Sequence, residues 1–199
     1  MSDTIREPIQ QRSIDKKNRI IEAGYSLFAK NGYFNTNTVE IAKMAGVSTG
    51  IVYGYFRDKR DILLEVLGIY IDNVFEPVIS MFEKIEKPLN FVKLITHAVD
   101  SVVETHKHNA AIHEALHSLS STDKEVNDRF LSLEKEMTEK ISARLVALGY
   151  ERENLYERVH LAIETIQSYA HECVYDKHSY IDYAKMRSIV ISMLMSLFN

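Results

Sequence analysis

The stretch from Asn37 to Lys59 constrains the fold more than any other part of the chain, because two short helical patterns meet in it at a glycine. The first pattern opens at Asn37, whose side chain can cap free backbone N–H groups, and Glu40 completes a capping box three residues later. Gly46 can adopt the left-handed conformation that ends a helix. Ser48 is then a suitable N-cap for a second helix. A helix, a short turn with glycine and a second helix are the sequence form of a helix-turn-helix.

The expected second helix, residues 49–56, has an unusual composition for a surface helix. Thr, Gly and Tyr stand where Glu and Lys are common, and each of the two glycines costs roughly 1 kcal/mol relative to Ala. Close approach to a phosphate backbone or a base edge is one demand that such residues meet. The pattern favours a helix that enters the DNA major groove, although an αα-hairpin with no DNA role has the same local pattern.

The rest of the chain also reads as helical. Its 199 residues include only three prolines and seven glycines, which favours long helices, and no pair of strand patterns is visible. We therefore predict an all-α protein. Charge is unevenly divided: residues 1–60 carry a net charge of +4 and residues 61–199 carry −8. A basic first third on an acidic body suits a nucleic-acid-facing end joined to another module.

Three parts are predicted. Residues 1–14 are polar, contain a proline and show no apolar period, so they are interpreted as a flexible arm. Residues 15–60 form a three-helix DNA-binding domain whose first helix spans 15–31, and Tyr33 and Phe34 pack the corner that follows it. Residues 61–199 form a second helical domain with a surface for dimerisation.

The last two predicted helices, about residues 154–175 and 181–198, are apolar over more than one face. A helix that is apolar all round is buried on all sides. Pairing these helices with the same two helices of a second copy would bury them in a four-helix interface. We therefore expect a homodimer, while a fully internal helix in a monomer is the alternative.

Residues 17–67 resemble the N-terminal domain of the TetR (tetracycline repressor) family of bacterial transcriptional regulators. The resemblance covers about a quarter of the chain and agrees in spacing and residue type. It rests on the pattern Ile20-Ile21-x-Ala23-x-x-x-Leu27-Phe28-x-x-x-Gly32-Tyr33, on Thr36-Asn37-Thr38-Val39-Glu40-Ile41-Ala42-x-x-Ala45-Gly46-Val47-Ser48-x-Gly50-x-Val52-Tyr53-x-Tyr55-Phe56-x-x-Lys59, and on Leu63-Leu64.

The resemblance implies which residues contact DNA. Phosphate contacts are implied for Asn37, Thr38, Thr49, Tyr53, Tyr55 and Lys59, and base-edge contacts for Thr49, Gly50 and the neighbouring Ser48. The chain departs from the family pattern at Tyr55, where His is common and where a phenol can still donate to a phosphate. It also departs at Val39, where many members carry Arg or another polar residue, and this removes one possible base reader.

The resemblance further implies a dimeric repressor on double-stranded DNA. It would bind a palindromic operator, and an unknown small molecule bound in residues 61–199, the effector-binding and dimerisation domain, would release it. No catalysis and no cofactor are expected. A constitutive DNA-binding protein without an effector is a further alternative. The helix that begins near Lys59 is the covalent bridge between the two domains. It would therefore transmit the conformational change caused by the effector to the DNA-binding domain.

The predicted effector pocket draws on aromatic residues and on carboxylates set among apolar residues. A Glu that faces an aromatic cavity could select a cationic ligand. For each residue, the alternative is an aromatic side chain in the core or a carboxylate that is solvated or paired. The candidates are Tyr70, Phe75, Phe91, His113, Glu164 and Tyr169.

His113-Glu114-Ala115-Leu116-His117 matches the H-E-x-x-H pattern of zinc proteases, in which two histidines bind the metal beside a general-base Glu. No third ligand follows at a known spacing, and eight histidines in the chain make a chance match easy. We expect no metal site, and a zinc hydrolase or a metal in a sensor pocket is kept as an alternative reading.

Cys173 is the single cysteine, so one chain can form no disulfide framework. No signal peptide is recognisable, and the most apolar run, Ser188–Phe198, is too short to span a bilayer. We expect a cytoplasmic protein with no membrane association.

Overall fold

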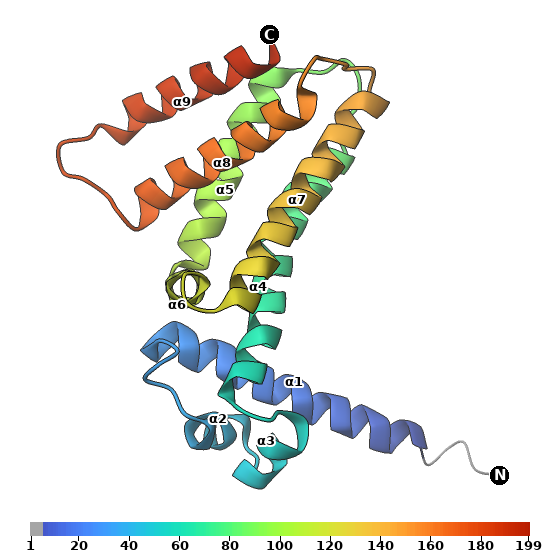
Figure 1. The fold of residues 1–199 in the computed structure, drawn as a ribbon, viewed down its shortest axis with the longest axis vertical. Helices are drawn as coiled ribbons and strands as arrows, with labels where there is room; N and C mark the ends of the chain where they lie inside the picture. The colour runs from blue at the N-terminus through green and yellow to red at the C-terminus, as the bar shows by residue number, and fades with distance from the viewer. Residues whose placement is uncertain (1–5) are drawn as a thin grey trace. The chain divides into compact units, whose positions relative to one another are not determined.

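A computed structural model describes residues 6–199, which form nine α-helices and no strand (Figure 1). The all-α prediction is therefore confirmed. The helices are α1 (Arg6–Asn31), α2 (Thr38–Ala45), α3 (Thr49–Tyr55), α4 (Lys59–Glu83), α5 (Phe91–His108), α6 (Ala110–Ser120), α7 (Lys124–Ala147), α8 (Leu155–Val174) and α9 (Tyr183–Phe198).

Helix α1 begins nine residues earlier than the sequence analysis predicted. The helix starts at Arg6 rather than at Asp15, so most of the expected flexible arm is helical and its first five residues lie outside the described residues. Pro8 falls in the first turn, where a backbone N–H has no partner within the helix, so proline is tolerated there. Gln11 Nε2 donates to Asp15 Oδ1 over 2.9 Å, one turn along the helix. The prediction was wrong because it treated the proline and the polar composition as a break.

The chain divides into two compact units. The first comprises the chain through Tyr70 together with Ala111–Val126, and the second comprises Ile71–Ala110 together with Asn127–Asn199. The predicted boundary after Arg60 differs from this division, because the first turns of α4 and most of α6 belong with the helix-turn-helix. Contacts between segments far apart in sequence determine this grouping, and no local pattern reveals them.

The core of the first unit forms where α1 packs against α2 and α3. The apolar side chains of α1 are buried in this core, where they meet apolar residues of α2, α3 and α4. The fully buried side chains of this core include Ile20, Phe28, Ile41, Val52 and Ile62.

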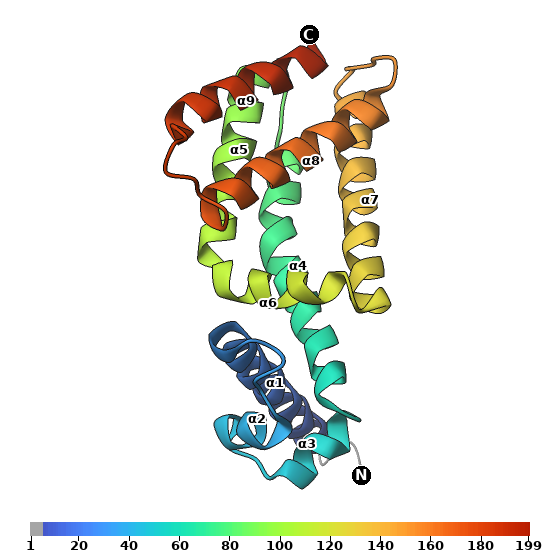
Figure 2. The ribbon, with the colours of Figure 1, turned by 60° about the vertical axis from the view of Figure 1, so that its left-hand side comes forward.

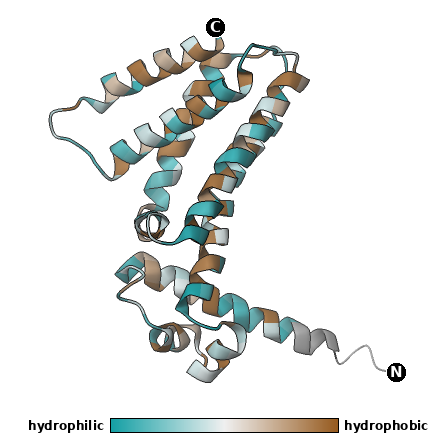
Figure 3. Ribbon diagram, viewed as in Figure 1, coloured by the Kyte–Doolittle hydropathy of each residue, from teal (hydrophilic) through white to brown (hydrophobic). Residues whose placement is uncertain are grey.

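The second unit is organised around α5, which packs against both α8 and α9 (Figure 2). Its almost fully buried side chains include Val99, Leu145, Val159, Ala170 and Leu194. Helix α4 continues past Pro77 to Glu83, so this proline does not end the helix. In Figure 3, α9 is brown or pale along most of its length, in agreement with the apolar composition noted in the sequence.

None of the helices within residues 6–199 is both long enough and apolar enough to cross a membrane.

Candidate nucleic-acid interface

The start of α2 is fixed by a capping box. Asn37 Oδ1 accepts hydrogen bonds from the backbone N–H groups of Val39 and Glu40, over 3.1 and 3.0 Å. Glu40 Oε2 in turn accepts from the backbone N–H of Asn37 over 3.3 Å. Gly46 ends the helix in the left-handed conformation, with φ of 67°. The predicted capping box and the predicted glycine stop are both confirmed.

Ser48 begins the second helix of the motif, as predicted. Its Oγ accepts from the backbone N–H of Ile51 over 3.4 Å. Val52 is fully buried, which fixes the face that α3 turns toward the core. The helix ends at Tyr55, and Phe56 is its buried C-cap residue rather than its last helical residue. The opposite face of α3 is left for solvent or for a partner.

Two tyrosine hydroxyls tie the exposed side of α3 to neighbouring helices. Tyr53 OH lies 3.1 Å from Thr38 Oγ1 at the start of α2, and Tyr55 OH lies 2.9 Å from Ser13 Oγ on α1. Tyr53 is 55% exposed, so its ring is presented on the surface while its hydroxyl is held in place. The structure therefore brings Thr38 and Tyr53, two of the predicted DNA contacts, into one hydrogen-bonded pair.

Lys59 is anchored to the backbone of its own unit. Its ammonium donates to the carbonyl oxygens of Tyr33 and Thr36, over 2.6 and 2.7 Å. It also lies 4.2 Å from the centre of the Tyr33 ring. Burial lowers the pKa of Lys59 below its ordinary value. An ammonium has three donors, so two carbonyl contacts leave one N–H to donate elsewhere.

The remaining predicted contact residues differ in their exposure. Asn37, Ser48 and Gly50 are exposed, whereas Thr49 is half-buried. A side chain could be added at either glycine of α3: at Gly54 a methyl group would meet nothing within 4 Å, and at Gly50 its nearest neighbour would be Ser48 Oγ at 3.9 Å. Packing within the described residues therefore gives no reason for these two glycines.

Phe34 is more exposed than the sequence suggested. Phe34 was expected to pack a corner, but it is 74% exposed, and of the two aromatic residues only Tyr33 contacts Phe28 in the core. Val39 is 62% exposed at the first turn of α2. A large aromatic residue that follows a helix is ordinarily expected to be buried. No local sequence signal shows which of Tyr33 and Phe34 packs against the core.

The predicted effector residues do not form one group. Tyr70 and His113 pack together in the first unit, with the Tyr70 hydroxyl hydrogen-bonded to His113 Nδ1. Both side chains are buried. In the second unit, Tyr169 is a buried core residue whose hydroxyl donates to the carbonyl of Tyr183 over 3.3 Å, and Glu164 is exposed.

The second unit contains a cavity of about 60 Å³, and of the six effector candidates only Phe91 lines it. Phe75 is a partly buried neighbour of the same core but does not line the cavity. Sequence reasoning missed Gln167, which lines the cavity from α8, because a polar residue on a mostly apolar helix is ordinarily assigned to the solvent side. No carboxylate lines this cavity, so the predicted pairing of a Glu with an aromatic cavity is not found in it.

The H-E-x-x-H segment lies on α6. The rings of His113 and His117 are 3.9 Å apart between centroids, and Glu114 is exposed. Among residues 6–199, no group of three or more His, Cys, Asp or Glu side chains is placed to hold a metal ion.

Taken together, the capped helices, the left-handed turn and the exposed face of α3 define a helix-turn-helix protein. Residues 20–66 match the profile of the family described as bacterial regulatory proteins, tetR family. Residues 20–66 therefore form a TetR-family domain, and the similar proteins and solved structures indicate a TetR-family transcriptional regulator. The recognition made from the sequence is confirmed.

Similar proteins support the family from both sequence and fold. The chain is 36% identical over 85 residues to the HTH-type transcriptional regulator HbdR of Aromatoleum sp. strain CIB. The matched region covers 43% of this chain and 36% of that protein. The chain thus spans about a third of the length of the curated relatives it matches.

Solved structures share the fold across nearly the whole chain. A crystal structure of a TetR-family regulator from Mesorhizobium loti matches with a TM-score of 0.75 at 15% identity, over 94% of this chain and 96% of that one. The regulator FadR from Bacillus subtilis, solved in complex with stearoyl-CoA, matches with a TM-score of 0.65 at 22% identity, over 91% of this chain and 98% of that one.

Proposed function

We propose that this protein is a dimeric transcriptional repressor that binds a palindromic operator through α3 and is released by a small molecule. DNA binding is assigned to the helix-turn-helix around residues 15–60. Effector binding and dimerisation are assigned to the helices that follow. The TetR-family match of residues 20–66 supports this function. The main structural support is the composition of the exposed surface of α3.

The two glycines of α3 are the observation on which the DNA-binding role depends. Gly50 and Gly54 weaken a helix of seven residues, and their surroundings would accept a methyl group at either position. A position that is kept bare without an internal reason suits close approach by an external backbone. The phosphate backbone of DNA at the edge of the major groove is such a partner.

The polar groups beside these glycines suit phosphate contacts. The hydroxyls of Tyr53 and Thr38 are hydrogen-bonded to each other, and the Tyr55 hydroxyl is hydrogen-bonded to Ser13. These side chains are therefore already ordered, and binding DNA costs them little conformational entropy. Asn37, Lys59 and the N-cap Ser48 lie in the same motif, and Thr49 is left as the base-edge candidate beside Gly50. We propose these residues as the DNA contacts.

A second copy of the chain is proposed to cover α8 and α9. These neighbouring helices leave large apolar side chains exposed, among them Leu161, Ile189 and Met193, which are 52%, 66% and 52% exposed. Ile189 and Met193 are one turn apart, so they lie on one face of α9. A two-fold dimer would bury this face and would also supply the symmetry that a palindromic operator requires.

The effector is proposed to bind in the second unit. That unit contains the 60 Å³ cavity, and the fold is shared with a regulator solved with stearoyl-CoA and with another solved with choline. A ligand that fits only one conformation would shift the population away from the DNA-binding form. The predicted effector residues other than Phe91 stay proposals for a conformation with a different cavity.

The proposal is tested by fluorescence anisotropy with the upstream intergenic DNA of the protein's own gene and a shuffled control, at about 150 mM salt, where non-specific binding is weak. We expect tight binding to the native fragment that is lost in Tyr53→Ala. Tyr180→Ala is the matched control, since Tyr180 is 78% exposed in the segment between α8 and α9. Equal, weak binding of both fragments by the unaltered protein would contradict the proposal.

His113→Ala separates the repressor from the alternative zinc hydrolase. A hydrolase would lose its turnover with this change, whereas the repressor would retain specific DNA binding. Metal analysis of the purified protein provides the second measurement, and a stoichiometric zinc ion that is lost in the variant would favour the hydrolase.

A further inference from the structure

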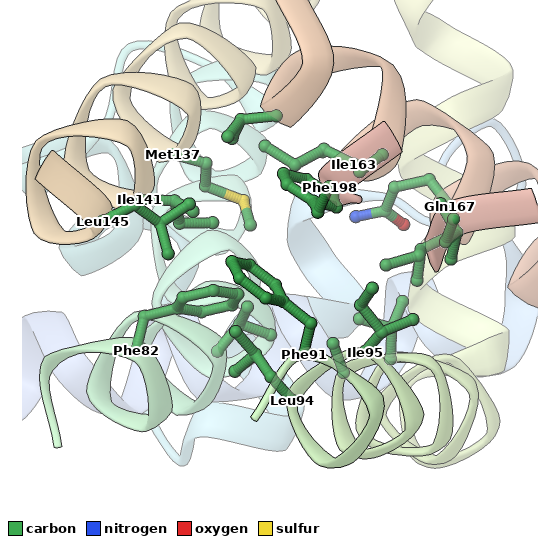
Figure 4. Close-up of a pocket in the computed structure, with 17 residues that line it drawn as sticks. Phe82, Phe91, Leu94, Ile95, Met137, Ile141, Leu145, Ile163, Gln167 and Phe198 are labelled. Carbon is green, nitrogen blue, oxygen red and sulfur yellow. The ribbon is translucent and has the colours of Figure 1, made fainter. Parts of the chain in front are cut away.

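The cavity of the second unit has an almost entirely apolar lining, contributed by α4, α5, α7, α8 and α9 (Figure 4). Sixteen of its 17 lining residues are apolar, and the remaining one is Gln167. A single buried water needs roughly 10–15 Å³ of such space, so about 60 Å³ admits a slender group rather than a bulky one. Because water gains few hydrogen bonds there, an apolar ligand group that displaces it would bind favourably.

The lining excludes a charged ligand group. No Asp, Glu, Lys, Arg or His is among the described residues that line the cavity. Moving an ion from water into such surroundings without a partner costs several kcal/mol or more of desolvation free energy. Glu164, the carboxylate that the sequence offered for a cationic ligand, is exposed and does not line the cavity.

The aromatic residues do not provide a substitute for a carboxylate. A cation can bind over the face of an aromatic ring, but the rings of Phe91 and Phe198 stack on each other, with centroids 5.4 Å apart and planes within 9°. Tyr150 packs against Phe91 at 4.7 Å, and its hydroxyl donates to the Phe198 carbonyl over 2.8 Å. These contacts therefore cover part of the ring faces, and the three rings do not by themselves form an open cage.

Gln167 supplies the one polar contact that the lining offers. Its amide is directed toward the cavity beside Phe198 (Figure 4). A neutral amide has both donor and acceptor groups, so it can pair with a hydroxyl, an amide or a carbonyl. A ligand with one such group would satisfy the amide, and its apolar remainder would contact the other side chains.

We propose that this cavity binds an uncharged, slender aliphatic ligand that carries a single neutral hydrogen-bonding group, which Gln167 recognises. The inference deepens the proposed function and rests on it for the ligand's role as effector. It assigns the chemistry of the ligand for this cavity, which differs from the cationic ligand that the sequence suggested.

Three octyl compounds test the proposal on the full-length protein without DNA. 1-Octanol, nonanoate and octyltrimethylammonium share one eight-carbon alkyl chain and carry a neutral, a negative and a positive head group. By isothermal titration calorimetry we expect 1-octanol to bind at least about tenfold more tightly than either ion, a difference of about 1.4 kcal/mol. Equal binding of all three compounds, tightest binding of the ammonium compound, or no binding of 1-octanol would each overturn the proposal.

Variants test whether binding takes place in this cavity. Ala162→Leu places a larger side chain in the lining and should abolish 1-octanol binding, and Val159→Ile adds only one methylene and should weaken it at a smaller packing cost. Ala143→Leu makes the same change as the first variant at an exposed position of α7 and should bind as the unaltered protein does. Unchanged binding in both lining variants would overturn the proposal.

Gln167→Glu tests the recognition of the head group. The change keeps the size of the side chain and gives it a negative charge, so we expect the preference to move from 1-octanol toward octyltrimethylammonium. A merely structural role of Gln167 would weaken all three compounds alike and would contradict the assignment.

The failure of this inference differs from the failure of the proposed function. Specific DNA binding without binding of 1-octanol would overturn the ligand chemistry and leave the repressor intact. Binding of 1-octanol as predicted, without specific DNA binding, would support the ligand chemistry and contradict the repressor.

Discussion

Arg60 at the start of α4 forms a two-point ion pair with Asp123, the residue before α7. Nε lies 2.7 Å from one carboxylate oxygen and Nη2 lies 2.9 Å from the other. The same guanidinium contacts Glu125 at 2.9 Å. Asp123 also accepts from the backbone N–H groups of Glu125 and Val126, so it caps α7. This pair ties the segment after α6 to the helix-turn-helix unit.

The first prediction concerns the pH dependence of this pair. The hydrogen bonds from Arg60 lower the pKa of Asp123 from its ordinary 3.8 to about 2. A carboxylate whose pKa is lower in the folded state stabilises the protein above the unfolded-state pKa, and this contribution is lost as the pH falls toward 2. Arg60→Met should therefore lower the free energy of unfolding at pH 6, and the difference from the unaltered protein should be smaller at pH 3.

Urea unfolding followed by circular dichroism at the two pH values measures this difference. Lys135→Met removes an exposed cation from a 3.7 Å pair with Glu139 and serves as control, with little change expected at either pH. A difference between Arg60→Met and the unaltered protein that stays constant from pH 6 to pH 3 would show that the pair with Asp123 is not its source.

The second prediction concerns Gly24 of α1. A Cβ atom at this position would lie 2.6 Å from Ile62 Cγ2, and Ile62 is fully buried. A β-branched side chain has little rotamer freedom, so it cannot move aside. Gly24→Ala should destabilise the protein by about 1–2 kcal/mol, because the overpacking penalty of about 1–3 kcal/mol exceeds the gain in helix propensity.

Gly68→Ala is the matched control for this change. Gly68 lies within α4, and an added Cβ would meet nothing within 4 Å. We expect a gain of about 0.5–1 kcal/mol there, since alanine favours a helix interior. Chemical unfolding of both variants measures the two effects, and the same sign at both positions would refute the packing argument.

Local chemistry made the helix-turn-helix predictable. The caps at Asn37 and Ser48 and the stop at Gly46 each depend on residues within four positions of one another, so the sequence states them directly. The partner of Tyr70 was not predictable in this way, since His113 is 43 residues away. The lining of the cavity is likewise contributed by five helices, and Gln167 could not be assigned to it from the pattern of α8.

The third prediction concerns the two roles of Lys59. Its ammonium holds the carbonyls of Tyr33 and Thr36 in the free protein, and hydrogen bonds to charged groups contribute about 1.5–3 kcal/mol. Lys59→Met should therefore lower the free energy of unfolding by about that amount. If the third N–H contacts a phosphate, the slope of log affinity against log salt should also fall by about 1.

Lys43→Met is the control for the loss of a positive charge. Lys43 is exposed in the last turn of α2, and we expect its replacement to leave the stability nearly unchanged. Unfolding and anisotropy measurements on both lysine variants separate the structural role from the phosphate contact. Unchanged stability of Lys59→Met would contradict the anchoring role assigned to this residue.

The last prediction concerns the proposed dimer. Ile189 is 66% exposed on α9, and a dimer through α8 and α9 would bury it. Ile189→Glu would then place a charge in an apolar interface without a partner, which costs several kcal/mol. We expect the dissociation constant of the dimer to rise at least about a hundredfold, equivalent to about 2.8 kcal/mol. Sedimentation equilibrium measures it, with Val146→Glu as control, because Val146 is 46% exposed on α7. If Ile189→Glu leaves the dimer intact and Val146→Glu dissociates it, the interface lies on α7 instead of on the last two helices.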